Sequence, residues 1–326
     1  MSRLPNFLRP NDKVALCSSA RKISRRELDC AIELLKSKGL EVVLGDTIEL
    51  ENNQFAGSDK ERAKDIQQML DREDIKAIIF ARGGYGTVRI LDLLDFSEFE
   101  KHPKWLIGYS DVTAMLSHLY FNHGICSMHA SMPIDLKEGK DSGGCFEMMI
   151  DSLLGKAEMN LCFGKMDSSF GKMDSSFSKM NSRISKTDSR VEDIEFEGEM
   201  IGGNLSVLYS LLGSNSFGKT DGKILFIEDL DEYLYHIDRM MQALKRAGKL
   251  ANLSGIVVGS FSQMHDNSIA FGQSAYEIIA SAVEDYDYPK VFGANIGHES
   301  GKNAPIVVGG NAIVSVKDGM IYIKQR

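Results

Sequence analysis

The sequence predicts an α/β fold, with a parallel sheet in the first half of the chain and a mixed second half that ends in strands. In residues 1–155, short apolar strands alternate with longer helical stretches, which is typical of a parallel sheet covered by helices on both faces. Residues 163–190 interrupt this pattern with polar repeats, and residues 195–326 mix helices with strands. We therefore predict domains at 1–155 and 195–326, joined by a linker at 156–194.

The first half carries clear signals for helix starts. Ser24 with Glu27, and Ser58 with Glu61, are two capping-box patterns, in which a serine and a later glutamate satisfy the free N–H groups of a first turn. We expect strands at residues 14–17, 41–44, 77–80, 104–109 and 126–132, and helices at 24–38, 58–72, 87–94 and 112–122, with one more ending at 154–155.

The linker contains four tandem heptads, FGKMDSS, FGKMDSS, FSKMNSR and ISKTDSR, at residues 163–190. Phe and Met at the first and fourth positions resemble a coiled-coil seam. Gly, Ser and Asp recur in the units, however, and they are poor helix formers. We interpret the repeats as a linker or projecting loop. A helix, or phenylalanines that line a groove or a dimer contact, are the alternatives.

The second half combines both kinds of element. Residues 317–319, Lys-Asp-Gly, are a strong hairpin signal between two strands within 306–324. We expect further strands at residues 195–203, 223–227 and 256–261, and helices at 204–212, 233–246 and 275–283.

Composition excludes several classes of function. A net charge of −8 and a pI near 5.5 give no electrostatic footprint for nucleic acid. Neither a signal peptide nor a run of 18 apolar residues is present, so we expect no membrane contact. The five cysteines are odd in number and lack metal-type spacing, which favours reduced thiols in the cytoplasm. We expect no metal and no cofactor.

A serine on a sharp strand-to-helix turn is the first candidate catalytic group. Residues 108–112 read GYSDV, between the strand expected at 104–109 and the helix that follows. The free N–H groups and the dipole of a helix start favour the negative charge that develops when a hydroxyl attacks a carbonyl. Ser110 fits this nucleophile elbow, although only the first three positions match G-x-S-x-G. The alternative is a plain helix N-cap.

Serine hydrolysis also needs a base and an acid that orients it. His298 lies in a glycine-flanked loop, NIGHESG, and Glu228 ends an apolar strand. A helix cap is the alternative role for Glu228, and Asp229 is equally placed for it. We expect surface or structural roles for His102, His118, His123, His236 and His265.

The glycines at 83, 84 and 86 lie at the carboxyl edge of the predicted sheet, where ligands bind such folds. They match neither a Walker motif nor a full GxGxxG, so close approach of the backbone to a substrate is the better interpretation.

Five segments together resemble the LD-carboxypeptidase family of serine peptidases, which are muropeptide hydrolases. They are ARGGYG (81–86), IGYSDVTA (107–114), GGNLSVL (202–208), KILFIEDLDEYLYHIDRM (223–240) and GANIGH (293–298), and they run in family order. The chain departs from the family pattern at Cys17-Ser18, at Ala130-Ser131 and in the heptads.

The resemblance implies a Ser-His-Glu triad made of Ser110, His298 and Glu228. It implies oxyanion donors from the backbone N–H groups of Asp111 and Gly84. It also implies a Rossmann-like N-terminal domain and a smaller, strand-rich, barrel-like C-terminal domain, with the site in the groove between them and the chain in a homodimer.

The implied activity is hydrolysis of the amide between the L-centre of a diamino acid and the terminal D-alanine of murein tetrapeptides, in cytoplasmic cell-wall recycling. Such an enzyme must also bind a free carboxylate. Arg82 is our candidate for this contact, and a salt bridge that braces its loop is the alternative.

Two other functions compete with this prediction. The microcin-immunity branch of the family hydrolyses peptidyl-adenylate amides and stacks the adenine on a tryptophan of the C-terminal domain. Trp105 is the only tryptophan here and lies in the first half, which disfavours that branch. A non-catalytic protein that binds a small molecule or peptide in the same cleft is the second alternative.

Overall fold

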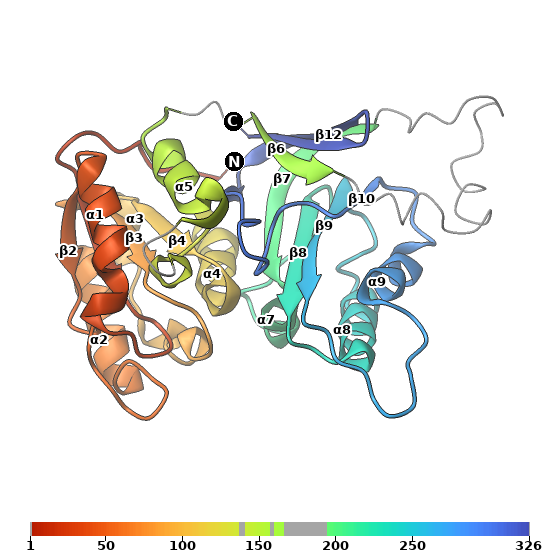
Figure 1. Cartoon of the computed structure of the whole chain (residues 1–326), viewed down its shortest axis with the longest axis horizontal. Coiled ribbons are helices and arrows are strands. Elements are labelled where there is room, and N and C mark those ends of the chain that lie inside the picture. The colour runs from red at the N-terminus through yellow and green to blue at the C-terminus, as the bar shows by residue number, and fades with distance from the viewer. Residues whose placement is uncertain (1, 137–140, 157–159, 166–193, 326) are drawn as a thin grey trace.

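The computed structural model describes residues 2–136, 141–156, 160–165 and 194–325. Its strands form two sheets that lie side by side in two lobes (Figure 1). The first sheet has the strand order β11-β5-β4-β3-β1-β2, and the second has the order β10-β9-β8-β7-β12-β13-β6. The predicted α/β class is therefore confirmed.

Five parallel strands build most of the first sheet. They are β1 (Lys13–Cys17), β2 (Glu41–Leu44), β3 (Ile75–Phe80), β4 (Trp105–Gly108) and β5 (Ser127–His129). The main helices around it are α1 (Asp29–Ser37), α2 (Asp59–Asp71), α3 (Ser97–Lys101), α4 (Thr113–His123) and α5 (Cys145–Leu153).

Helices cover both faces of this sheet. Alternate residues of a strand point to opposite faces, so each strand contributes to both layers of the core. Val14 and Leu16 of β1 belong to the apolar cluster that contains α1 and α5. Ala15 and Cys17 belong to the larger cluster that contains α2, α3 and α4. The near-continuous apolar sequence of each strand follows from burial on both faces.

Both predicted capping boxes are present. Ser58 accepts a hydrogen bond from the backbone of Glu61, whose carboxylate in turn accepts from the backbone N–H of Ser58. The Ser24 box opens a short 3₁₀ turn, Arg25–Leu28, that leads directly into α1. These two helix starts were therefore predicted correctly.

The helix predicted at 87–94 is wrong. The chain instead makes two 3₁₀ turns, Thr87–Arg89 and Leu91–Leu93. Buried Arg62 donates to the carbonyl of Gly86, which an α-helix would use to accept from Ile90, and the N–H of Ile90 bonds to the carbonyl of Thr87 instead. The Asp111 carboxylate holds the same turn by accepting from the N–H of Thr87. The β-branched residues in this segment also have a low helix propensity.

The second sheet is mixed and curves as a half-barrel (Figure 1). Its parallel strands are β7 (Ile194–Asn204), β8 (Ile224–Leu230), β9 (Gly255–Ser262) and β10 (Lys290–Phe292), and its antiparallel strands are β12 (Asn311–Lys317), β13 (Met320–Gln325) and β6 (Asn160–Lys165). The predicted hairpin joins β12 to β13, and Asp318 and Gly319 have the positive φ angles, 49° and 75°, of its turn. Helices α7 (Leu205–Ser210), α8 (Leu234–Arg246) and α9 (Ala275–Val283) complete this lobe.

The two lobes share structure. Strand β11 (Ile306–Val308) comes late in the chain but pairs antiparallel with β5 in the first sheet. Helix α4 contacts β5 on one side and β7 and α7 on the other, and most of its residues are buried. One apolar cluster runs through both lobes. Their relative position is therefore fixed by a common core.

The predicted linker at 156–194 overlaps the second sheet at both ends. Within it, β6 is an edge strand paired with β13, and Phe163 is 1% exposed in the shared core. Residues 166–190, which hold the rest of the heptads, lie outside the described residues. In the described part of the chain, no helix has the length and apolar character needed to cross a membrane.

Phe163 gives a test of this packing. Phe163→Ala should lower the free energy of unfolding by about 3–5 kcal/mol, because a buried aromatic ring is lost and a cavity remains. Urea unfolding measures the change. Phe170→Ala, at the same position of the next identical heptad, is the matched control, and the linker interpretation predicts little change. A loss below about 1 kcal/mol for Phe163→Ala would show that β6 contributes little to the core.

Candidate active site

Ser110 lies at the carboxyl end of β4, on the 3₁₀ turn Ser110–Val112 that leads into α4. Its φ angle is +60°, a left-handed conformation that is uncommon for a residue with a side chain. Such backbone strain clusters at functional sites, where the surrounding structure enforces it. The structure thus has the backbone geometry expected for a nucleophile elbow.

The glycine loop lies directly against this turn. A Cβ placed on Gly83 would be 3.2 Å from Ser110 Oγ and 3.4 Å from the backbone nitrogen of Asp111. Among the described residues, the N–H groups of Asp111 and Gly84 have no hydrogen-bond acceptor. Two free donors therefore remain near the serine, as an oxyanion hole requires.

The side chain of Asp111 has a separate, structural contact. Its Oδ2 accepts a hydrogen bond of 2.8 Å from the backbone N–H of Thr87, and burial raises the pKa of this carboxyl group. Asp111 thereby ties the glycine loop to the serine turn.

His298 and Glu228 form a close pair. The Nδ1–H of His298 donates to Oε2 of Glu228 over 2.7 Å, with Glu228 fully buried and the His298 side chain 12% exposed. A Cβ on Gly297 would lie 2.4 Å from Ser260 Oγ and 3.0 Å from Glu228 Oε2. Only glycine fits there, which explains why a glycine precedes the histidine.

The pair changes the protonation of both groups. Burial alone would raise the pKa of Glu228, but the His298 imidazolium and its hydrogen bond lower it overall. Burial alone would lower the pKa of His298, but the Glu228 carboxylate raises it overall. The environment thus favours a carboxylate beside an imidazolium.

Asp229 has hydrogen-bond partners at the start of α7 and none from His298 among the described residues. Its carboxylate accepts from the side-chain amide of Asn204 and from the N–H of Ser206, both over 2.9 Å. Asn204 in turn caps α7. Burial and the nearby Glu228 charge raise the pKa of Asp229 to about 7. Asp229 therefore supports the helix start, while Glu228 contacts the histidine.

Tyr109 connects the serine turn to the histidine. Its ring lies 4.7 Å from the His298 imidazole, centroid to centroid, and its hydroxyl donates to Asp135. No hydrogen bond joins Ser110 Oγ to His298 among the described residues, and catalytic hydrogen bonds are often long before substrate binds. The structure brings all three predicted residues to the same region between the lobes.

A cavity of about 630 Å³ opens beside His298 between the two lobes. It is lined by Tyr109, Ser131, Asp135, Asp141, Ser142, Cys145, Gly297, His298, Glu299, Ser300, Gly301 and Asn303. Its position agrees with the predicted groove between domains.

His129 was not recognised from the sequence. It is fully buried at the end of β5, and its ring packs edge-on against Tyr109 and Phe226 at centroid distances of 5.7 and 5.1 Å. Burial lowers its pKa to about 4, so the ring is neutral near pH 7. Its place beside Gly108 in the sheet was the available signal, since that puts it next to the serine turn.

Arg82 is half-buried, and its guanidinium donates to the carbonyl of Lys22 over 3.1 Å. This contact fits the alternative role of bracing the loop, and the predicted contact with substrate stays a prediction. In the described residues, no group of three or more His, Cys, Asp or Glu side chains is arranged to hold a metal ion.

The comparison with known families identifies the fold. Residues 14–130 match the LD-carboxypeptidase N-terminal domain, and residues 197–314 match the LD-carboxypeptidase C-terminal domain. The chain belongs to the LD-carboxypeptidase family. It is 32% identical to a probable murein peptide carboxypeptidase of Bacillus subtilis, over 98% of this chain and 94% of that protein.

Solved structures of LD-carboxypeptidase relatives share the fold. The muramoyltetrapeptide carboxypeptidase of Oxalobacter formigenes aligns with a TM-score of 0.78 at 25% identity, over 96% of this chain and 98% of its own. The microcin C7 self-immunity protein MccF, in complex with adenosine monophosphate, aligns with a TM-score of 0.80 at 22% identity, over 99% of both chains.

The electrostatics of the pair give a direct prediction. His298 should titrate above the ordinary histidine pKa of about 6.5, and Glu228→Gln should move its pKa down, because burial remains while the carboxylate charge is lost. NMR titration of the imidazole protons measures both values.

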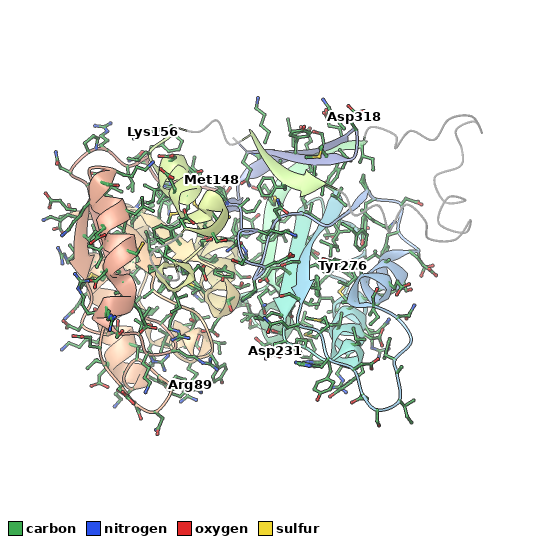
Figure 2. All side chains as sticks on the ribbon, viewed as in Figure 1. Arg89, Met148, Lys156, Asp231, Tyr276 and Asp318 are labelled. Atoms are coloured by element: carbon green, nitrogen blue, oxygen red, sulfur yellow. The ribbon has the colours of Figure 1, made fainter. Side chains whose placement is uncertain are left out.

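Asp231→Asn is the control. Asp231 follows the end of β8 (Figure 2) and pairs with the exposed His265, so the substitution should leave the pKa of His298 unchanged. A wild-type His298 pKa below that of an ordinary histidine would contradict the pairing.

Proposed function

We propose that this protein is a serine carboxypeptidase that hydrolyses the amide between the L-centre of a diamino acid and the terminal D-alanine of murein tetrapeptides. The observation that carries this proposal is the buried Glu228–His298 pair beside the strained turn of Ser110. The names of the Bacillus and Oxalobacter relatives support the same substrate class.

In the proposed reaction, Ser110 Oγ attacks the scissile carbonyl carbon while His298 Nε2 takes the hydroxyl proton. The Glu228 carboxylate stabilises the imidazolium that results. The backbone N–H groups of Asp111 and Gly84 stabilise the oxyanion. His298 then gives its proton to the departing amine of D-alanine. Water, activated by the same histidine, attacks the acyl-enzyme, releases the shortened peptide and restores the serine.

The microcin-immunity activity is the nearest alternative, and the position of Trp105 disfavours it. That ring is fully buried and its indole N–H donates to the carbonyl of Asn6, so it has no free face for an adenine. The likeness to MccF is a likeness of fold. A non-catalytic binding protein has no need for a buried ion pair in the same region as a strained serine.

We also propose that the protein works in the cytoplasm as a homodimer, as the family resemblance implies. The free state of Cys17, Cys30, Cys126 and Cys145 is consistent with a reducing compartment. Light scattering of the purified protein tests the dimer.

The nucleophile can be tested by Ser110→Ala. This variant should fold normally and lose tetrapeptide hydrolysis by about 10⁴-fold, as expected when a triad serine is removed. Mass spectrometry of murein tri-, tetra- and pentapeptide digests measures the activity, and metal chelators should have no effect on the wild type. Substantial hydrolysis by the alanine variant, or inhibition by a chelator, would exclude the serine mechanism.

The acid can be tested by comparing two neighbouring variants. Glu228→Gln should lower kcat by about 10²–10⁴-fold with a smaller change in KM, because the charge that stabilises imidazolium is lost. Asp229→Asn should act mainly on stability, because Asp229 holds Asn204 and the start of α7. The opposite ranking in steady-state kinetics would assign the triad acid to Asp229.

A further inference from the structure

An exposed arginine, Arg21, packs against the glycine loop at residues 83–86, and this loop lies beside the proposed nucleophile. Arg21 follows the carboxyl end of β1, in a turn where Ser18 Oγ donates to its carbonyl over 2.6 Å. We propose that Arg21 binds the free carboxylate of the terminal D-amino acid, and thereby makes the enzyme a carboxypeptidase rather than an endopeptidase. This inference rests on the proposed function.

The contact between Arg21 and Gly84 is close. A Cβ placed on Gly84 would lie 2.5 to 2.8 Å from Cδ, Cγ and Nε of Arg21. Gly84 has a φ angle of +115°, which other residues rarely adopt. The missing side chain therefore lets the arginine stem lie directly over the loop that carries a proposed oxyanion donor.

The same loop also contacts the proposed nucleophile, through Gly83. Gly83 lies against Ser110 Oγ, and Gly84 lies against Arg21, so two consecutive glycines connect the hydroxyl to the guanidinium. A substrate carbonyl bound at the oxyanion donors is three bonds from the carboxylate carbon of its terminal residue. That carboxylate is the substrate anion nearest to the reacting carbon, and Arg21 is a long side chain next to it.

Neighbouring cations in the first lobe already have partners. Lys22 pairs with Glu51, and Arg82 donates to a backbone carbonyl. Arg62 and Arg89 both pair with Asp59. Within the described residues, Arg21 has no ion pair and no side-chain hydrogen bond. Its fork of N–H donors is thus available for two parallel hydrogen bonds to a carboxylate.

The cavity beside His298 is unsuitable for that carboxylate. Asp135, Asp141 and Glu299 line it, and its described lining contains no Lys or Arg. Three carboxylates line the cavity against the single imidazole of His298, so an anion placed there would be repelled, whereas a carboxylate on the Arg21 side of the serine would be attracted. The charge distribution across the site therefore orients the substrate with its terminus towards Arg21.

The test compares two substrates with the wild type and with each of four variants. The lysine-type tetrapeptide L-Ala-γ-D-Glu-L-Lys-D-Ala is used as the free acid and as its C-terminal amide, which lacks only the terminal carboxylate. Arg21→Gln should lower kcat/KM for the acid by about 10- to 100-fold, the range expected for hydrogen bonds to a charged group, mainly through KM. The wild type should cleave the amide at a similarly reduced rate, and Arg21→Gln should lower that rate no further.

Three other variants serve as comparisons. Lys22→Gln removes one positive charge from the adjacent residue and should leave the preference for the acid unchanged, since Lys22 pairs with Glu51. Arg21→Lys keeps the charge without the fork and should recover part of the loss. Equal losses on acid and amide, or no loss, would overturn the assignment. A loss of acid preference in Arg82→Gln instead would assign the contact to Arg82.

Two further experiments identify which substrate carboxylate Arg21 binds and test its role independently of the proposed activity. Replacing D-Glu by D-isoglutamine, or lysine by diaminopimelate, changes the other carboxylates, and a dependence of the Arg21 effect on either change would overturn the assignment to the terminus. If the wild type cleaves no tetrapeptide, the proposed function fails. Titration calorimetry of acid and amide on Ser110→Ala, with and without Arg21→Gln, then still decides the role of Arg21.

Discussion

A carboxylate that is completely removed from water is costly unless it has a charged or hydrogen-bonding partner, and this constraint acts on Glu228. Its partner, His298, comes from a loop 70 residues later in the chain. The pair can form only while β8 and the loop after β10 keep their relative positions. Gly297 is needed because a side chain there would meet Ser260 and Glu228. Strand β8 of the half-barrel and the loop after β10 together hold the His298 imidazole against this buried anion.

Ser110 belongs to the other lobe, and the position of its turn is fixed by helix α4. Helix α4 begins at the serine turn and is buried between the two sheets, so it cannot shift without disturbing both. At its first turn, Thr113 Oγ1 accepts from the N–H of Asn204, and Asn204 binds Asp229, the neighbour of Glu228. A short chain of hydrogen bonds thus runs from the helix that follows Ser110 to the strand that carries Glu228.

Much of the fold and of the candidate site could be predicted from the sequence because its signals are local. The capping boxes, the hairpin turn at Asp318-Gly319, and the strand-to-helix turn of Ser110 each depend on neighbouring residues. The contact between Glu228 and His298 required knowledge of a family pattern, since no local rule pairs residues so far apart.

What could not be predicted depends on tertiary contacts. The helix expected at 87–94 was displaced by bonds from Asp111 and Arg62, which lie in other elements. His129 and Arg21 were given no role from the sequence, and they become notable only through their neighbours, the Tyr109 ring and Gly84. Strand β6 was hidden by the repeats that begin within it.

The late strand β11 has a consequence for the order in which this protein reaches its native state. It supplies the partner of β5 in the first sheet, yet its residues, Ile306–Val308, are made only after β7, β8, β9 and β10 of the second sheet. Until they are made, β5 is an edge with unpaired backbone groups, and open edges of this kind recruit other strands. The first sheet therefore cannot be completed before the parallel strands of the second sheet have been made, so the two lobes reach their native state together.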